Sequence, residues 1–314
     1  MFNFEINNLS QYRLLNPSQN IEHYFKRPDV SGLPSPFSIA VILTLVVMIW
    51  ASLSMTSGGL FQNFVQVLIY WENGIWNESL LVFAYQMMLI LVLGHILVLS
   101  HPLQKLLDTL TYPINTNAKA LIVVSISTML MAFLNWGLGL IFGAILVRKI
   151  GESSVKKGFK LNYPLLGAAG YIGLMVWHGG LSGSAPLKVA ESGHLASLSS
   201  IEVPDFIATT QTILSLENLI VFGLLLVIMP LLFLILKRFS NLKEIQFEKP
   251  FQNNKDKTIN FKTSSFENSR LPAMGFGFLI LIAFMVQYGD ILAQFRLTPN
   301  MLNFFMLGLA FILH

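Results

Sequence analysis

The chain has 314 residues but no cysteine and few charges, and each shortage narrows what it can be. Without cysteine there can be no disulfide, thiolate metal site or cysteine nucleophile. Charged residues make up 11% of the sequence, against roughly 25% in ordinary soluble domains. There is also no glycine-rich phosphate loop and no cluster of histidine and carboxylate ligands. The sequence therefore gives no support to a metal, nucleotide or nucleic-acid site, and we expect no cofactor beyond a coupling ion.

Long apolar runs stand where charge is missing, and 54% of the residues are hydrophobic. A helix needs about 20 largely apolar residues to cross a bilayer. Several runs approach or exceed that length, so the sequence predicts an all-α, polytopic transmembrane protein. The runs are Phe37–Met55, Ser79–Ser100, Ala120–Val147, Asn218–Leu236 and Leu271–Gly289.

Basic residues predict how the chain is oriented in the membrane. Cytoplasmic loops are enriched in Lys and Arg. The segment Thr56–Glu78 has neither, whereas Arg148–Lys160 has five such residues and Lys237–Arg270 has eight. We therefore expect the last two segments to be cytoplasmic. Arg13, and the basic pair that precedes the first run, predict a cytoplasmic N-terminus as well.

The run Ala120–Val147 conflicts with this orientation if it crosses the membrane once. A re-entrant hairpin that turns at Asn135–Gly139 removes the conflict, because Asn and Gly suit an irregular tip. Its arms, Ala120–Leu134 and Leu140–Val147, are expected to be too short to cross. One long, tilted span is the alternative. A further segment, Leu60–Trp76, is interpreted as an interfacial helix or a partial span.

The segment Tyr163–Leu187 carries no charge, yet its helical pattern stops at Trp177–Pro186, which contains three glycines and a proline. Unwound backbone at membrane depth must face protein or a watery cavity. A broken helix beside hydroxyls and a titratable histidine is typical of solute sites in secondary transporters. The free glycine N–H groups and the N-terminus of the half-helix after the break would favour an anion.

Four segments follow from these patterns. We predict a cytoplasmic N-terminal segment (1–36), a first transmembrane repeat (37–236), a cytoplasmic linker (237–270) and the start of a second repeat (271–314). The last apolar stretch, Met301–Leu313, is too short to cross. We therefore expect the second repeat to be incomplete and the chain to be a truncated part of a longer protein.

Several local strings resemble the short-chain fatty acid transporter family. They are Tyr70–Trp76, Gln86–His95, Leu134–Gly137 and, most specifically, Val176–Ser184. That family is similar to a larger ion-transporter superfamily, in which each of two inverted repeats pairs a re-entrant hairpin with an unwound helix. The resemblance implies that the hairpin tip and the break form one half of a substrate site.

The resemblance also implies a function. It predicts a secondary membrane transporter, not an enzyme, that takes up butyrate- or acetoacetate-like monocarboxylates with H⁺ or Na⁺ as the coupling ion. It places a multi-pass protein in the bacterial cytoplasmic (inner) membrane. The expected partners are the short-chain carboxylate and the lipid bilayer, with a homo-oligomer as a further expectation and no nucleic acid.

Individual residues in the two motifs receive roles on chemical grounds. The Ser182 and Ser184 hydroxyls can donate to a carboxylate, and His178 can bind it or carry a proton. Asn135 can orient substrate or ligate Na⁺, and Trp136 can close over an alkyl tail. Each residue also has a purely structural interpretation. The serines could let helices pack closely, His178 could be neutral and hydrogen-bonded to a carbonyl, Asn135 could form an ordinary turn, and Trp136 could lie at the membrane interface. The predicted substrate-binding set is Asn135, Trp136, Gly137, His178, Gly179, Gly180, Ser182, Gly183 and Ser184.

Four further points stay open. His194 is a second candidate for proton coupling, and Lys188 stands where an uncharged residue is expected. A serine hydrolase built from Ser182 or Ser184 with a histidine is an alternative function. However, Gly180–Gly183 lacks the Gly-x-Ser-x-Gly spacing of a nucleophile elbow. A channel is a second alternative, which would conduct without saturation.

Overall fold

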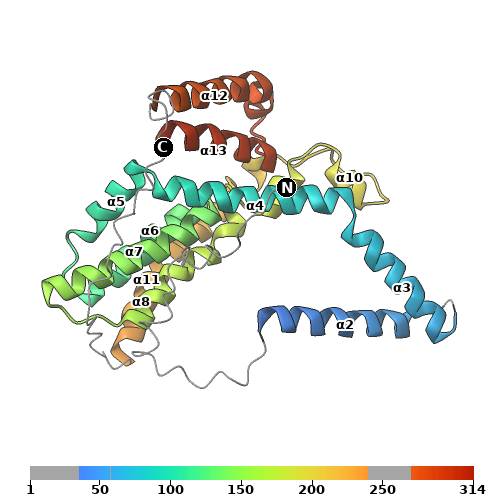
Figure 1. The fold of residues 1–314 in the computed structure, drawn as a ribbon, viewed down its shortest axis with the longest axis horizontal. Helices are drawn as coiled ribbons and strands as arrows, with labels where there is room; N and C mark the ends of the chain where they lie inside the picture. The colour runs from blue at the N-terminus through green and yellow to red at the C-terminus, as the bar shows by residue number, and fades with distance from the viewer. Residues whose placement is uncertain (1–34, 57, 240–269) are drawn as a thin grey trace, which may run out of the picture. The chain divides into compact units, whose positions relative to one another are not determined.

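A computed structural model describes residues 35–56, 58–239 and 270–314 (Figure 1). Those ranges hold helices and turns and no strand. Five of the helices are long and apolar enough to cross a membrane, which confirms the prediction of an all-α polytopic membrane protein. The chain divides into two compact units, residues 1–80 and 81–314, each described here by itself. The five helices are Phe37–Ser54, Glu78–Leu99, Asn117–Leu134, Leu216–Phe239 and Arg270–Ala293.

The first unit is built on helices α2 (Pro36–Ser54) and α3 (Leu60–Ile75), which pack against each other. The Ser35 hydroxyl accepts the Ser38 N–H and caps α2, as serine commonly does at helix starts. The turn between the helices is held by Asn63, whose side-chain amide donates to two backbone carbonyls at the end of α2. With 16 residues, α3 is about 24 Å long, shorter than the hydrocarbon core of a bilayer.

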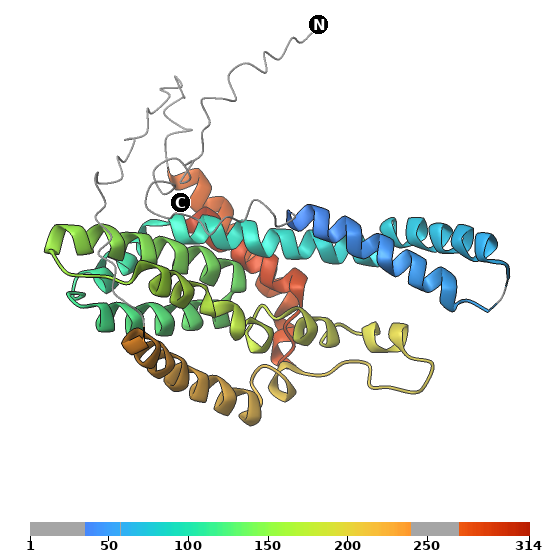
Figure 2. The same cartoon turned by 90° about the horizontal axis from the view of Figure 1, so that it is seen from below.

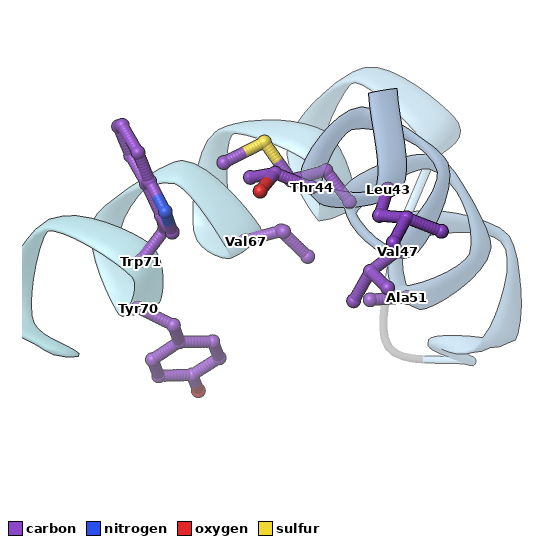
Figure 3. A pocket seen from close by; sticks show the side chains of 8 residues that line it. Leu43, Thr44, Val47, Ala51, Val67, Tyr70 and Trp71 are labelled. Atoms are coloured by element: carbon purple, nitrogen blue, oxygen red, sulfur yellow. The ribbon is translucent and has the colours of Figure 1, made fainter. Parts of the chain in front are cut away.

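A pocket of about 550 Å³ opens between α2 and α3 (Figure 3). Its lining holds no charged residue and no residue of the predicted hairpin tip or break, so it is not the predicted substrate site. The lining residues are Leu43, Thr44, Val47, Met48, Ala51, Val67, Tyr70 and Trp71.

The second unit includes most of α4 (Glu78–Leu99), then α5 (His101–Thr111) and the pair α6 (Asn117–Leu134) and α7 (Trp136–Lys157). Helices α6 and α7 run antiparallel and lie side by side with α8 (Tyr163–Tyr171) (Figures 1 and 2). The Lys157 ammonium at the end of α7 donates to carbonyls just before α6, 2.6 and 2.9 Å away. The chain therefore reverses direction at Asn135, as the sequence predicted.

The arms of this hairpin are longer than predicted, at 18 and 22 residues. The expectation that both were too short to cross is wrong, because α6 alone is long enough for a span. Helical hydrogen bonding continues through the charged end of α7, where Arg148 and Glu152 pair at 3.0 Å with favourable i,i+4 spacing. Gly158, with φ of 69°, ends the helix in the left-handed conformation. That the hairpin is re-entrant stays a prediction.

The predicted break is present in the described structure. After α8, which has nine residues, the chain forms the 3₁₀ turns η2 (Ile172–Met175) and η3 (Trp177–Gly179), and then α9 (Ser184–Val189). No continuous α-helix spans these residues. The regular helix ends at Tyr171, six residues before Trp177, so the irregular stretch is longer than the sequence indicated.

The remaining elements are the short helix α10 (His194–Leu198), a 3₁₀ turn η4 (Thr209–Gln211), and the helices α11 (Leu216–Phe239), α12 (Arg270–Ala293) and α13 (Pro299–Leu313). Helices α12 and α13 pack on each other. Residues 1–34 and 240–269 lie outside the described residues, and with them nearly all of the predicted N-terminal segment and linker. The predicted four-segment division stays a prediction.

A side chain from the α12–α13 turn holds the stretch that follows α9. Arg296 donates to the Ala190 carbonyl at 3.0 Å and to the Ser192 hydroxyl at 2.7 Å. Its guanidinium group also lies 4.0 Å from the centre of the Phe206 ring, close enough for a cation–π interaction. We call this set of contacts the Arg296 clasp.

Candidate functional site

The hairpin tip and the break are in direct contact. The Trp136 N–H donates to the Ser182 hydroxyl oxygen, with 2.8 Å between the two heavy atoms. One residue earlier in the break, the Leu181 N–H donates to the Phe133 carbonyl at 2.7 Å. The two stretches that the sequence singled out therefore meet through two hydrogen bonds, one from each side.

Asn135 is the only described residue between α6 and α7, and its conformation makes the tip. Its backbone is extended, with φ of −155° and ψ of 124°, so the helix cannot continue through it. Its side-chain oxygen accepts the Leu138 N–H at 2.8 Å and caps α7, while its amide nitrogen lies 3.1 Å from the Met306 sulfur. A buried asparagine thus both ends and restarts a helix.

The tip is less irregular than expected, because the prediction placed all of Asn135–Gly139 outside helices. Trp136, Gly137 and Gly139 belong to α7. A side chain on Gly137 would place its Cβ 2.8 Å from the Leu91 Cα of α4. The glycine at this position therefore lets two helices approach closely rather than freeing the backbone for a ligand.

The glycine at position 180 has a similar role in the break. A Cβ built there would lie 2.5 Å from the Phe133 carbonyl oxygen, closer than real Cβ contacts come. Because the obstructing atom belongs to the backbone of α6, it cannot move aside cheaply. Only glycine at position 180 lets the break rest against the end of α6.

The expectation of free glycine N–H groups at the break is wrong. The N–H groups of Gly179, Gly180 and Gly183 donate to backbone carbonyls at 3.2, 3.0 and 2.9 Å. Each acceptor lies three residues earlier, which is the pairing of a 3₁₀ turn. Buried backbone donors strongly favour such partners. The three glycine N–H groups find theirs within the unwound segment itself. These three glycine N–H groups are therefore not available to a ligand.

Two serines offer hydroxyl groups at different depths. Ser182 is fully buried, and because its oxygen accepts from Trp136, its hydroxyl hydrogen is directed elsewhere. Ser184 is half-buried and is the first residue of α9. That helix has six residues, so it cannot supply the helix-dipole contribution expected from the half-helix. Carboxylate binding would depend on the hydroxyls themselves.

An aromatic group covers the same region. The ring centres of Trp136 and Trp177 are 5.3 Å apart in an edge-to-face arrangement, and His178 lies 4.1 Å from Trp177. His178 is exposed, whereas the Trp136 indole nitrogen is buried and has no hydrogen-bond partner among the described residues. A buried donor without an acceptor is costly, which makes this N–H a candidate to bind a ligand.

The other predicted residues are not part of this contact. His194 begins α10, beyond α9, where its N–H donates to Glu191 O at 3.4 Å. Within the described residues neither Ser182 nor Ser184 has a hydrogen bond to a histidine, so the nucleophile–base pair of a hydrolase is not formed there. No group of three or more His, Cys, Asp or Glu in the described ranges could hold a metal ion.

The sequence reasoning missed Asn218. Its side-chain amide donates to the Gly179 carbonyl at 2.8 Å and to the Ile213 carbonyl at 2.7 Å. It thereby fixes the start of α11 to the break. The sequence did hold a signal for this residue, because Asn218 is an amide at the start of an otherwise apolar run. A polar side chain within a membrane needs a defined hydrogen-bond partner.

Lys188 takes part in an ion pair just after the break. Its ammonium lies 2.8 Å from the Glu191 carboxylate. Four residues before it in α9 is Ser184. From the sequence we expected an uncharged residue at position 188. The structure places there one half of a charged, partly buried pair beside the predicted site.

Comparison with known proteins identifies the family whose sequences this chain matches. A family model described as short chain fatty acid transporter matches residues 26–314. A protein of Escherichia coli (strain K12), named as a candidate short-chain fatty acid transporter, is 34% identical over 214 residues. A protein of Haemophilus influenzae with the same name is 29% identical over 297 residues. No solved structure matches the chain significantly.

The matches differ in how much of each protein they cover. They include 67% and 90% of this chain but 44% and 62% of the Escherichia coli and Haemophilus influenzae relatives. The chain therefore spans about half the length of the curated relatives that it matches.

Proposed function

The chain belongs to the short-chain fatty acid transporter family, and we propose that it provides one half of the substrate site of a secondary carrier for short-chain monocarboxylates. The observation that carries the proposal is the contact between the hairpin tip and the break, through Trp136 and Ser182. Paired hairpins and unwound helices are how secondary carriers present polar groups to a solute at membrane depth.

The groups around this contact match a small carboxylic acid. The Ser182 and Ser184 hydroxyls and the unpartnered Trp136 indole N–H can donate to two carboxylate oxygens. Hydrogen bonds to a charged acceptor are about twice as strong as neutral ones. The faces of Trp136 and Trp177 supply an apolar surface for a short alkyl tail. The chemistry involves binding and release only, with no covalent step.

His178 fits the role of a gate residue at the exposed edge of this group. It is exposed, and its ring centre lies 4.1 Å from that of Trp177 in a tilted arrangement. We propose that it attracts the carboxylate before the hydroxyls bind it. Asn135, which holds the tip in shape, would act on binding through the position of Trp136.

The proposal extends to the setting of the protein. The helices long enough to cross a bilayer and the family both fit a multi-pass membrane protein. We propose the cytoplasmic (inner) membrane of a bacterium, with the N-terminus in the cytoplasm as the basic residues predict, and uptake of the acid driven by a coupled H⁺ or Na⁺ gradient. A homo-oligomer stays a prediction.

Uptake of labelled butyrate into proteoliposomes that contain the chain tests the proposal. Uptake should saturate with concentration and should stop when an ionophore collapses the driving gradient. Replacing His178 with Ala, or Ser182 with Ala, should cut uptake while the protein still inserts into the membrane. Undiminished uptake in both variants would contradict the site. Uptake that rises linearly with concentration would favour a channel.

A further inference from the structure

The ion pair between Lys188 and Glu191 has no role in the site described above. The ammonium and carboxylate are 2.8 Å apart, and their side chains are 18% and 26% exposed. The ammonium also lies 5.7 Å from the centre of the Phe83 ring in α4. Charges held this far from water carry a desolvation cost that only a partner offsets. An anion beside this lysine therefore offsets part of its desolvation cost.

Lys188 shares a helix face with a residue of the predicted site. Ser184 is four residues earlier in α9, and residues four apart lie on the same face with Cβ atoms about 5–6 Å apart. Glu191 is three residues beyond Lys188. Glu191 lies just beyond the end of α9 at Val189 and pairs with Lys188, so a hydroxyl, an ammonium and a carboxylate follow the break in sequence order. The four-carbon side chain of lysine is long and flexible enough to serve either neighbour.

We propose that the substrate carboxylate replaces Glu191 as the partner of Lys188, and that Glu191 takes up one proton from solution in the exchange. This inference rests on the proposed function and names the coupling ion as H⁺. In the empty site, Lys188 is paired with ionised Glu191. In the loaded site, it is paired with the ionised substrate, and Glu191 carries the proton on one carboxyl oxygen. No other bond forms or breaks.

Two physical effects favour this exchange. A partly buried carboxylate that loses its cation is stabilised by protonation, because burial disfavours the charged form. The empty and loaded sites also have the same net charge, since one anion and one proton enter together. A site of unchanged charge moves across a low-dielectric membrane at less cost than one that gains a charge. The predicted stoichiometry is therefore one proton for each carboxylate.

Other charged and titratable groups lie near Glu191. Within the described residues, none of those named below has a hydrogen bond or ion pair with its carboxylate. Arg296 is bonded to Ala190 O and Ser192 Oγ rather than to Glu191. The His194 N–H contacts only the backbone oxygen of Glu191, and Asp205 accepts the Gly193 N–H. His178, on the turn η3 that packs against α9, is the competing proton acceptor.

Calorimetry of butyrate binding tests the proposal. The purified chain in lipid nanodiscs is titrated with butyrate at one pH in two buffers of different ionisation enthalpy, and the difference in heat gives the number of protons bound. We expect uptake of close to one proton per butyrate. Glu191→Gln should still bind butyrate but take up no proton. Lys188→Gln should weaken binding by about tenfold or more, because the charged partner is lost.

Control variants separate this outcome from general damage. Glu152→Gln removes the carboxylate of the Arg148 pair in α7, whose side chains are 30% and 31% exposed, and should change neither affinity nor proton uptake. The double variant Lys188→Gln with Glu191→Gln removes both charges together. It should fold and should bind weakly without a proton, even if either single variant unfolds.

The possible failures are distinguishable. Binding by the parent protein without proton uptake would overturn the exchange and leave the proposed function standing. Proton uptake that persists in Glu191→Gln, or that disappears in His178→Ala while butyrate still binds, would place the proton elsewhere and overturn it as well. No butyrate binding by the folded parent protein would contradict the proposed function itself.

Discussion

The backbone N–H of Trp136 and the side-chain oxygen of Ser182 lie 2.8 Å apart, although the residues are separated by 46 positions in the sequence. The bond joins the first turn of α7 to the middle of the break. Because Ser182 is fully buried, no bulk water can replace it as an acceptor. Ser182 therefore serves the structure as well as a ligand, and its replacement should affect both.

Ser182→Ala should lower the thermal stability of the protein. The Trp136 N–H would lose its acceptor, and a buried unsatisfied donor costs about 1–3 kcal/mol. Thermal unfolding in nanodiscs measures the change. Ser125→Ala is the matched control, because Ser125 is also fully buried but its hydroxyl donates to Leu121 O in its own helix. An equal loss of thermal stability in both variants would show that the hydrogen bond from Trp136 to Ser182 contributes no more than an ordinary buried hydroxyl does.

Gly180→Ala should separate the break from α6. Its Cβ would meet the Phe133 carbonyl at 2.5 Å, so butyrate binding should be lost or greatly weakened and stability should fall. Gly167→Ala in α8 is the control, since its Cβ would meet nothing within 4 Å. That change should be neutral or stabilise the protein by up to about 1 kcal/mol, because alanine favours a helix. Normal binding by Gly180→Ala would show that the close approach is unnecessary.

Trp136→Phe should separate stability from binding. Phenylalanine keeps an aromatic ring against Trp177 but removes the indole N–H that has no partner in the described structure. The empty protein should be no less stable, because a buried unsatisfied donor disappears. Butyrate affinity should fall by roughly tenfold, the effect of losing one hydrogen bond to a charged acceptor. Isothermal titration measures the affinity, and unchanged affinity would exclude the indole N–H from binding.

Asn135→Ala should destabilise the hairpin, whereas Asn135→Ser should restore most of the loss. The asparagine oxygen caps α7 by accepting the Leu138 N–H, and loss of such a cap costs about 1 kcal/mol. Serine can accept the same bond. Thermal unfolding of the two variants decides the matter. Equal losses would mean that the amide nitrogen, near Met306, matters more than the cap.

The spans and the position of the break could be predicted from the sequence, because both depend on local composition. Runs without charge gave the long helices, and Gly and Pro at Trp177–Pro186 marked the place where the helix fails. The hairpin turn at Asn135 also followed, from the basic residues after the run Ala120–Val147 and from Asn and Gly at the tip. Local patterns were sufficient for these features.

What could not be predicted depends on contacts between distant segments. The arms of the hairpin extend beyond their apolar parts because the ion pair of Arg148 and Glu152 lets helix continue through charged sequence. The glycine N–H groups at the break find 3₁₀ partners, which composition alone does not reveal. The bonds from Asn218 to Gly179 and Ile213 likewise exist only once α11 folds back on the break.

The Arg296 clasp has a mechanical consequence. The turn that joins α12 to α13 holds Ala190 and Ser192, only a few residues after the break. A shift of α9 during a transport cycle must therefore either drag that turn along with it or rupture the arginine's bonds. While those bonds hold, α9 and the α12–α13 pair, which lie on opposite sides of residues 240–269 in the sequence, would move together.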